Sequence, residues 1–207
     1  MSFTLKRGLS NIYVAKVTKD AEDAYTVGTP EKLIPAGEMG VSVDSESTPY
    51  YFDNTVFAII SREGGSEITI SGAGLRAAAI AKLNNKDVDE TTGAVFDSGV
   101  MEGESYFALG AEKENIDGTK ELFWFMKGTF AIPEETAKTK GEDTDASGTE
   151  LTYTAVPTVH KFTATGKVCK RVVIDTETTK VKDASDWFEQ VVTPDNAGTI
   201  VEKVASV

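Results

Sequence analysis

A short glycine motif carries the most specific chemistry in this sequence. Gly72 and Gly74 belong to a GxGxxA run, GAGLRA, that follows a strand-like segment and opens a helix-like one. In dinucleotide-binding folds such glycines let the backbone approach a pyrophosphate, and Asp97 follows at about the distance expected of an acid that binds the ribose. Those folds alternate strands and helices, whereas the rest of this chain is rich in hairpin signals. A dinucleotide-binding enzyme that uses Gly72 to Gly74 is therefore kept as an alternative.

An acidic stretch matches a calcium-binding loop only in part. Asp143, Asp145 and Gly148 have the spacing that opens an EF-hand loop. The twelfth position is Thr154, where a bidentate Glu is required, and no helix precedes the loop. We expect a solvated acidic loop without a metal site, and weak calcium binding there stays an alternative.

The residues needed for nucleophilic catalysis are scarce. His160 is the only histidine and Cys169 the only cysteine, and their spacing supports neither a Cys-His pair nor a Ser-His-acid triad. We expect Cys169 to be a small buried hydrophobic residue and His160 a partly exposed polar one. The sequence has no Walker loop, HExxH or GxSxG motif. We therefore expect no enzymatic activity and no cofactor.

Composition narrows the class of protein further. The chain has 207 residues, of which 40% are hydrophobic and 26% charged, so it is expected to fold as a single domain spanning residues 1–207. Its formal net charge of −12 argues against binding a nucleic-acid backbone. No apolar run is long enough for a signal-peptide core or a membrane span, so we expect no membrane partner. One cysteine excludes an internal disulfide framework.

The segment from Thr48 to Gly74, TPYYFDNTVFAIISREGGSEITISGAG, is dense in aromatic and β-branched residues. Such residues favour a pleated, half-buried backbone, so the segment is expected to form a strand pair. Residues 62–65, Arg-Glu-Gly-Gly, are predicted to supply its turn, since a Gly pair tolerates the positive φ of tight hairpins.

Other elements follow from hydrophobic periodicity and turn chemistry. Residues 74–83 predict one helix that covers a sheet face. Asp117-Gly118 predicts a hairpin whose second arm, LFWFMKGTF at 122–130, is apolar on both faces and must be covered on both sides. A second short helix is predicted around Trp187, capped by Asp183 or Ser185. The fold class is thus mainly β, a β-sandwich or barrel with a flanking α-helix and long hairpins or arms.

Two segments lack enough apolar residues to order themselves. Residues 134–150 are rich in charge, Gly, Ser and Thr, which predicts a long acidic loop. Residues 194–207, after Pro194, are predicted to form a C-terminal arm. In a protein that assembles, the loop at 134–150 is a candidate for contacts with a neighbouring subunit.

The order and spacing of these segments resemble the major tail protein family of tailed phages that infect Gram-positive bacteria. The resemblance covers most of the chain, although none of the matching segments is a catalytic motif. In order they are NIYVAKVT, TPYYFDN, EGGSEITISG, YFALG, IDGTKELFWFMKGTF, IPEETAKTK and ELTYTAVPT.

The resemblance implies a structural role. Such subunits form hexameric rings that stack into the tail tube through which the genome passes, so the implied partners are further copies of the chain and the tape-measure, terminator and baseplate proteins. DNA would pass without specific binding, since an acidic lumen repels phosphate. The implied location is the virion tail, after assembly in the bacterial cytoplasm.

Aromatic density, together with the TPYYFDN segment that carries the resemblance, selects residues for the core or for subunit contacts, and the sequence does not choose between the two. The selected residues are Tyr50, Tyr51, Phe52, Asp53, Asn54, Trp124, Phe125 and Trp187.

The main alternative function is a monomeric β-sandwich module for adhesion or carbohydrate binding, which has the same strand pattern.

Overall fold

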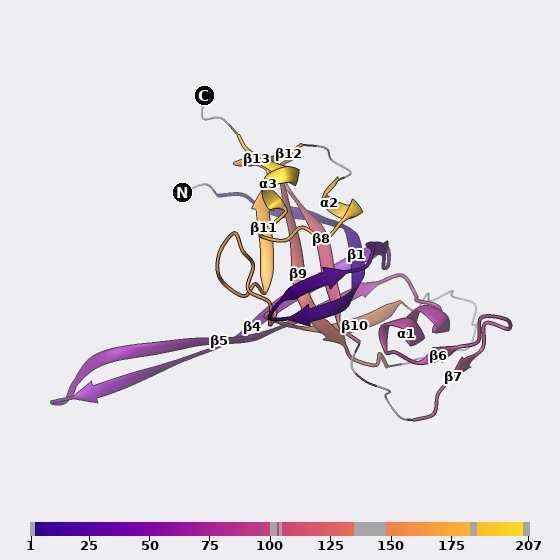
Figure 1. Ribbon diagram of the computed structural model, residues 1–207. Helices are drawn as coiled ribbons and strands as arrows, with labels where there is room; N and C mark the ends of the chain where they lie inside the picture. The colour runs from indigo at the N-terminus through magenta and orange to yellow at the C-terminus, as the bar shows by residue number, and fades with distance from the viewer. Residues whose placement is uncertain (1–2, 100–102, 104, 135–147, 183–185, 205–207) are drawn as a thin grey trace, which may run out of the picture.

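The protein is built on one large antiparallel sheet, from which a long hairpin projects (Figure 1). The computed structural model describes residues 3–99, 103, 105–134, 148–182 and 186–204. The strands are β1 (Lys6–Ala21), β2 (Ala24–Val27), β3 (Glu31–Lys32), β4 (Ala36–Phe52), β5 (Thr55–Gly72), β6 (Asp87–Val88), β7 (Val95–Phe96), β8 (Phe107–Asn115), β9 (Lys120–Phe130), β10 (Thr149–Val156), β11 (Arg171–Asp175), β12 (Thr179–Val181) and β13 (Val201–Lys203). The helices are α1 (Ala77–Leu83), α2 (Asp186–Glu189) and α3 (Ala197–Ile200).

The main sheet curls until its two ends approach each other. Its strand order is β2-β1-β8-β9-β10-β5-β4, with β11 paired to β9 and β3 paired to β1. β3 pairs with β1 near one end of this order, and β4, the strand at the other end, follows β3 within a few residues. Between them, Leu33 N–H donates to the Ile12 carbonyl of β1 at 2.8 Å. This link closes the sheet into a barrel-like form. The prediction of a mainly β fold with a flanking helix and a long hairpin is confirmed.

β9 is covered on both faces, as its sequence predicts. Phe123 and Phe125 pack into a cluster with Tyr153 on one face, while Trp124 and Met126 pack on the other. Burial of the apolar side chains on both faces is a large stabilising contribution, at about 25 cal/mol for each Å² removed from water. The first cluster joins β1, β5, β8, β9, β10 and α1, and the second is covered by the C-terminal segment.

The C-terminal segment folds onto the body, which corrects the prediction of an arm from residue 194. Trp187 is fully buried, and Ile200 in α3 is 2% exposed. β13 then pairs with β12, from Val181–Val201 to Thr179–Lys203. The apolar residues of this segment gain more by covering the second cluster than by extending into solvent. The predicted capping residues 183 and 185 lie outside the described residues.

The hairpin predicted between β8 and β9 is confirmed. Gly118 adopts φ +85°, and its N–H donates to the Asn115 carbonyl at 3.0 Å. The predicted acidic loop at 134–150 falls mostly outside the described residues, and its last two residues, Thr149 and Glu150, begin β10.

The glycine motif does not lie in a dinucleotide-binding unit. Every strand pair among the described residues is antiparallel, so the βαβ unit that the motif requires is not formed there. Gly72 ends β5, where an added Cβ would lie 2.4 Å from the Pro35 carbonyl oxygen, and this close approach explains the glycine. Asp97 forms an ion pair with Lys86. In the part of the chain described, no helix is long and apolar enough to cross a membrane.

Candidate assembly surface

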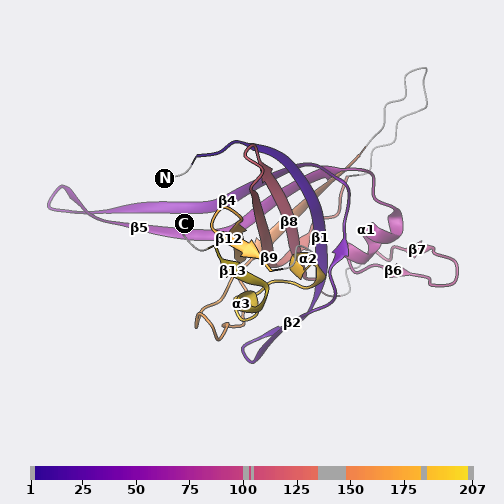
Figure 2. The same cartoon turned by 90° about the horizontal axis from the view of Figure 1, so that it is seen from above.

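The outer part of the β4–β5 hairpin, residues 44–65, extends beyond the body of the protein and is here called the arm. Figures 1 and 2 show it projecting from the sheet on the side opposite α1. β10 pairs with β5 only as far as Ser66, so the arm strands pair with each other alone. The arm is a two-stranded ribbon, which by itself is marginally stable in water.

The arm turns at Asp53 and Asn54, which corrects the turn predicted at residues 62–65. Asp53 and Asn54 have φ values of +50° and +62°, the pattern of a two-residue type I′ turn. Thr55 Oγ1 donates to the Phe52 and Asp53 carbonyls, each at 3.2 Å. Asn and Asp tolerate this backbone better than other residues that carry a Cβ.

The predicted Gly pair instead lies at the base of the arm. An added Cβ at Gly64 would come within 2.5 Å of an Asp44 carboxylate oxygen, and one at Gly65 would lie 3.3 Å from the Ala155 carbonyl. Lys170 forms an ion pair with Glu63 and donates to the Gly64 carbonyl at 3.2 Å. The arm is therefore anchored to the loop that precedes β11.

The register of the arm places large apolar side chains on both of its faces. Tyr51 pairs with Val56 and Pro49 with Ile59 on one face, because directly opposed residues of an antiparallel pair share a face. The other face holds Tyr50, Phe52 and Ile60. The pairing steps from Tyr50–Ala58 to Tyr51–Val56, so Phe57 is the extra residue of a β-bulge. The Phe57 ring packs edge to face on Phe52, with centroids 5.1 Å apart.

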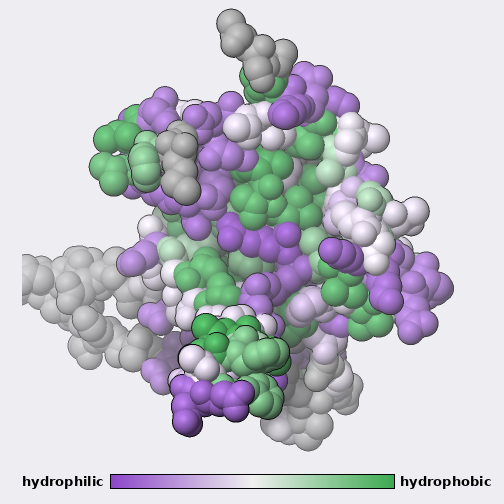
Figure 3. Space-filling view, turned by 90° about the vertical axis from the view of Figure 1, so that its left-hand side faces the viewer, coloured by the Kyte–Doolittle hydropathy of each residue, from purple (hydrophilic) through white to green (hydrophobic). Residues whose placement is uncertain are grey.

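These side chains are exposed on both faces alike. Tyr51 and Ile59 on one face are 62% and 63% exposed, and Phe52 and Phe57 on the other are 63% and 75% exposed. Figure 3 looks onto the side from which the arm projects and shows hydrophobic residues gathered at its end. A monomeric soluble protein rarely exposes an apolar patch of this extent.

The other residues selected from the sequence lie elsewhere. Trp124 and Trp187 are fully buried and Phe125 is 1% exposed, so all three belong to the core. The Trp124 indole donates to the Trp187 carbonyl at 3.0 Å. Tyr50, Tyr51 and Phe52 are on the arm. The residues selected from the sequence did not include the exposed apolar residues of the second arm strand, Val56, Phe57, Ile59 and Ile60. The signal for them was an apolar run on both sides of an Asp-Asn pair, which is the pattern of an apolar hairpin.

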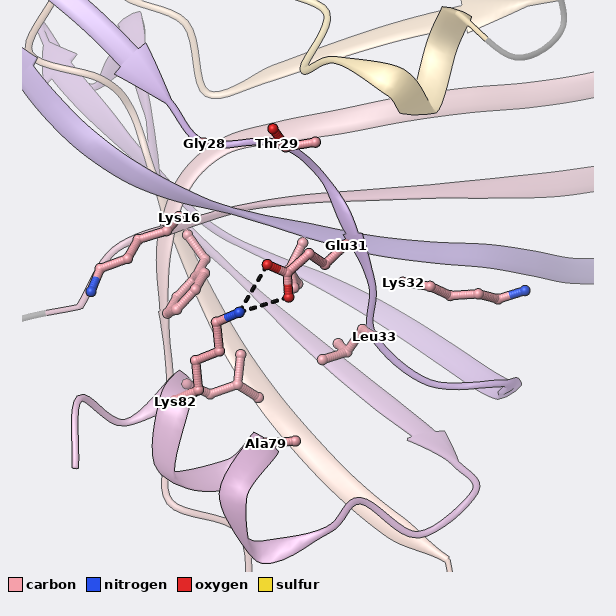
Figure 4. A pocket seen from close by; sticks show the side chains of 11 residues that line it. Lys16, Gly28, Thr29, Glu31, Lys32, Leu33, Ala79 and Lys82 are labelled. Carbon is pink, nitrogen blue, oxygen red and sulfur yellow. Dashed lines mark hydrogen bonds and ion pairs between the residues drawn. The ribbon is translucent and has the colours of Figure 1, made fainter. Parts of the chain in front are cut away.

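A pocket of about 300 Å³ lies on the other side of the molecule, between α1 and β3 (Figure 4). Its apolar lining includes Leu33, Leu83 and Phe107. The Lys82 ammonium donates to both carboxylate oxygens of Glu31, at 2.8 and 2.7 Å, across the mouth. Lys16 and Lys32 also line the pocket, and Figure 4 shows their side chains extending to its two sides.

No catalytic arrangement is found among the described residues. None of them form a cluster of three or more His, Cys, Asp or Glu side chains fit to hold a metal ion. His160 Nδ1 contacts the Glu22 carbonyl at 3.1 Å, and burial raises the pKa of the Cys169 thiol, which disfavours the reactive thiolate.

Comparison with known proteins finds similarity at the level of structure and not of sequence. No protein-family model matches the sequence, and no curated protein matches it. Among solved structures, the fold is similar to the tube-terminating cap of the anti-feeding prophage. The TM-score is 0.40 at 9% identity, over 84% of this chain and 93% of that chain.

Proposed function

We propose that this chain is a structural subunit of a phage tail tube, which associates with copies of itself into stacked rings and has no enzymatic activity. The observation that carries the proposal is the arm, an exposed ribbon with large apolar side chains on both faces. The sequence resemblance to major tail proteins supports hexameric rings and passage of the genome through the tube.

The exposed area of the arm suits a specific protein contact. Its aromatic and β-branched side chains are Tyr50, Tyr51, Phe52, Val56, Phe57, Ile59 and Ile60, each 47–75% exposed. Together they offer about 700 Å², at about 100 Å² for each side chain, against about 800 Å² from one partner in a standard interface. Burial of that area gives a driving force for association.

The edges of the arm lead to the same conclusion. Within the described residues, the outer edge of β4 and the edge of β5 before Ser66 have no strand partner. Open edges invite pairing with another chain, and assembly into a closed ring removes them. A monomeric binding module would leave both the edges and the apolar faces in water.

Association as a function of concentration tests the proposal. The mass in solution, measured by light scattering from low to high protein concentration, is expected to rise, and negative-stain electron microscopy is expected to show rings or tubes. Phe57→Ser is expected to shift association to about tenfold higher concentration, since truncating a buried aromatic anchor costs more than 1 kcal/mol.

Phe96→Ser is the matched control, because Phe96 is 61% exposed and lies away from the arm, in β7. It is expected to associate like the unchanged protein. A chain that stays monomeric at every concentration, or equal effects of the two substitutions, contradicts the proposal and favours the binding module.

A further inference from the structure

We propose that Lys170 is a positioning residue, which holds the arm in one orientation from a fixed place in the body, and that association depends on this orientation. The inference rests on the proposed self-association and adds the residue that prepares the arm for it. Three features coincide at the base of the arm: the end of a strand ladder, a glycine bulge and two hydrogen bonds from one lysine.

The arm leaves the sheet at a break in the strand ladder. β10 pairs with β5 as far as Ser66, and past that residue the described strand partner of β5 is β4. Directly on the arm side, the pairing of β4 with β5 steps from Val43–Ser66 to Ser45–Glu63. Two residues of β5 thus oppose one residue of β4, which is the count that defines a β-bulge, and a bulge bends the strand that carries it.

The two bulged residues are Gly64 and Gly65, so this joint lacks side chains that would stiffen it. Glycine has the widest choice of backbone conformation and weakens a strand that contains it. From Glu63 to the turn at Asp53, about ten residues at about 3.3 Å each reach about 33 Å. A bend of about 20° at the joint, as small as the usual twist between neighbouring strands, would therefore move the tip by about 11 Å.

Lys170 spans this joint from a fixed support. Its backbone carbonyl accepts the Met126 N–H at 2.9 Å, which ties its main chain to β9 in the core. Its side chain is 16% exposed, and its ammonium donates to the Gly64 carbonyl at 3.2 Å and to a carboxylate oxygen of Glu63. Figure 1 shows the loop that precedes β11 above the place where the arm leaves the sheet. One lysine thus joins the body both to the bulge and to the residue next to it on the arm.

These two bonds suit a control of orientation better than a large contribution to folding. Ion pairs near the surface add little to stability, and the bonds of Lys170 lie outside the two core clusters. Their loss would free the joint and leave the core packed. Two proteins associate more tightly when the contact surface is already held in its bound arrangement, because less conformational entropy is lost. We therefore expect Lys170 to affect association far more than Tm.

The spread of arm orientations in the monomer tests the first step. Spin labels on Thr48→Cys in the arm and Lys16→Cys in β1, in a Cys169→Ser background, report the distance between arm and body by double electron–electron resonance. Both labelled positions are exposed. With Lys170 in place we expect one narrow distance peak. Lys170→Met keeps a long side chain but loses both bonds, so a broader peak is expected.

Three further variants control this measurement. Glu63→Ala removes one partner at a position whose side chain is 63% exposed, so the core is not disturbed, and the peak is expected to broaden as well. Lys170→Arg keeps donors for both acceptors and is expected to retain the narrow peak. Lys82→Met is the matched control, because it breaks an exposed ion pair, with Glu31 at 2.7 Å, on the side of the molecule away from the arm. It is expected to leave the peak narrow.

Association tests the second step. Lys170→Met is expected to raise the concentration of half-association about tenfold, which corresponds to about 1.4 kcal/mol. Lys170→Arg and Lys82→Met are expected to associate like the unchanged chain. Phe57→Ser separates contact from positioning, because it is expected to weaken association while the distance peak stays narrow.

The outcomes separate this inference from the proposed function. A narrow peak for Lys170→Met, or a broad peak already for the unchanged chain, shows that Lys170 does not set the orientation. A broad peak with equal or tighter association shows that the orientation is not needed. In each case the inference is wrong while the proposed function stands. An unchanged chain that never associates overturns the proposed function and the dependence of association on Lys170, and the distance peak of the monomer still decides whether Lys170 holds the arm.

Discussion

The Nζ atom of Lys127 lies 2.8 Å from a carboxylate oxygen of Asp20, and both side chains are almost fully buried. The same carboxylate accepts the backbone N–H groups of Val159 and His160, at 2.9 to 3.0 Å. Asp20 near the end of β1 thus holds the loop that follows β10 against β9. A buried carboxylate with three donors is stable only while it stays ionised.

This arrangement predicts a pH-dependent stability. Burial alone raises the pKa of Asp20, but the hydrogen bonds from Lys127, Val159 and His160 outweigh it and hold the pKa below its ordinary value of 3.8. A lowered pKa adds stability above the pKa of the unfolded chain, and that stability is lost as the pH falls below about 3.8. Asp20→Asn is expected to lower the free energy of unfolding by about 2 kcal/mol at pH 7.

Urea unfolding at pH 7 and pH 3 measures the effect. The loss caused by Asp20→Asn is expected to shrink at pH 3, because part of the stability that the ionised Asp20 contributes is already lost below pH 3.8. Asp23→Asn is the control, because Asp23 contacts Lys19 at 2.6 Å on the exposed surface and should have no measurable effect. A loss of equal size at both pH values would contradict the role given to the charge.

A second prediction concerns the contact between β8 and β9. Gly110 pairs with Trp124, and an added Cβ would lie 2.7 Å from two ring atoms of the buried indole. Gly110→Ala is therefore expected to cost about 1–3 kcal/mol of stability through overpacking. Gly8→Ala is the control, since its Cβ would meet Glu114 at an ordinary 3.5 Å. Equal denaturant midpoints for the two variants would show that the core adjusts around Trp124 at little cost.

A third prediction concerns the cover of the aromatic core. The Arg171 guanidinium lies 4.5 Å from the Phe123 ring centroid and 5.2 Å from that of Phe125, and it contacts Glu121 at 3.0 Å. Arg171→Lys keeps the charge but loses the planar group that stacks on the rings. A loss of about 1 kcal/mol, or about 2–4 °C in Tm, is expected. Arg76→Lys, at the exposed start of α1, should leave Tm unchanged, and an equal shift there would show that stacking is not the cause.

The sequence predicts those elements whose residues strongly favour one local backbone conformation. Asp117-Gly118 favours a positive φ and gives the β8–β9 turn. The aromatic-rich apolar run at 122–126 follows this turn, so it fits a strand covered on both faces. The two-sided burial of Phe123 and Trp124 was therefore predictable.

The rest depends on contacts between distant segments. Gly64 and Gly65 have the local chemistry of a turn, yet they are needed where Asp44 and Ala155 approach the backbone, so the turn moves to Asp53-Asn54. The sequence also does not separate buried Trp124 from exposed Phe57, because both lie in aromatic strands. Only the pairing of β10, which stops at Ser66, decides which stretch is covered.

The last prediction tests whether the shape of the arm tip matters for association. Asn54 adopts φ +62°, which a β-branched residue adopts only with strain of about 1–3 kcal/mol. Asn54→Val is expected to disorder the tip, speed amide hydrogen exchange between Tyr51 and Phe57, and weaken association, while Tm stays unchanged because the tip contributes nothing to the core. Asn54→Gly allows the same φ and is expected to associate normally. If Asn54→Val speeds exchange at the tip but associates as well as Asn54→Gly, the tip is not part of the contact and only the sides of the arm are.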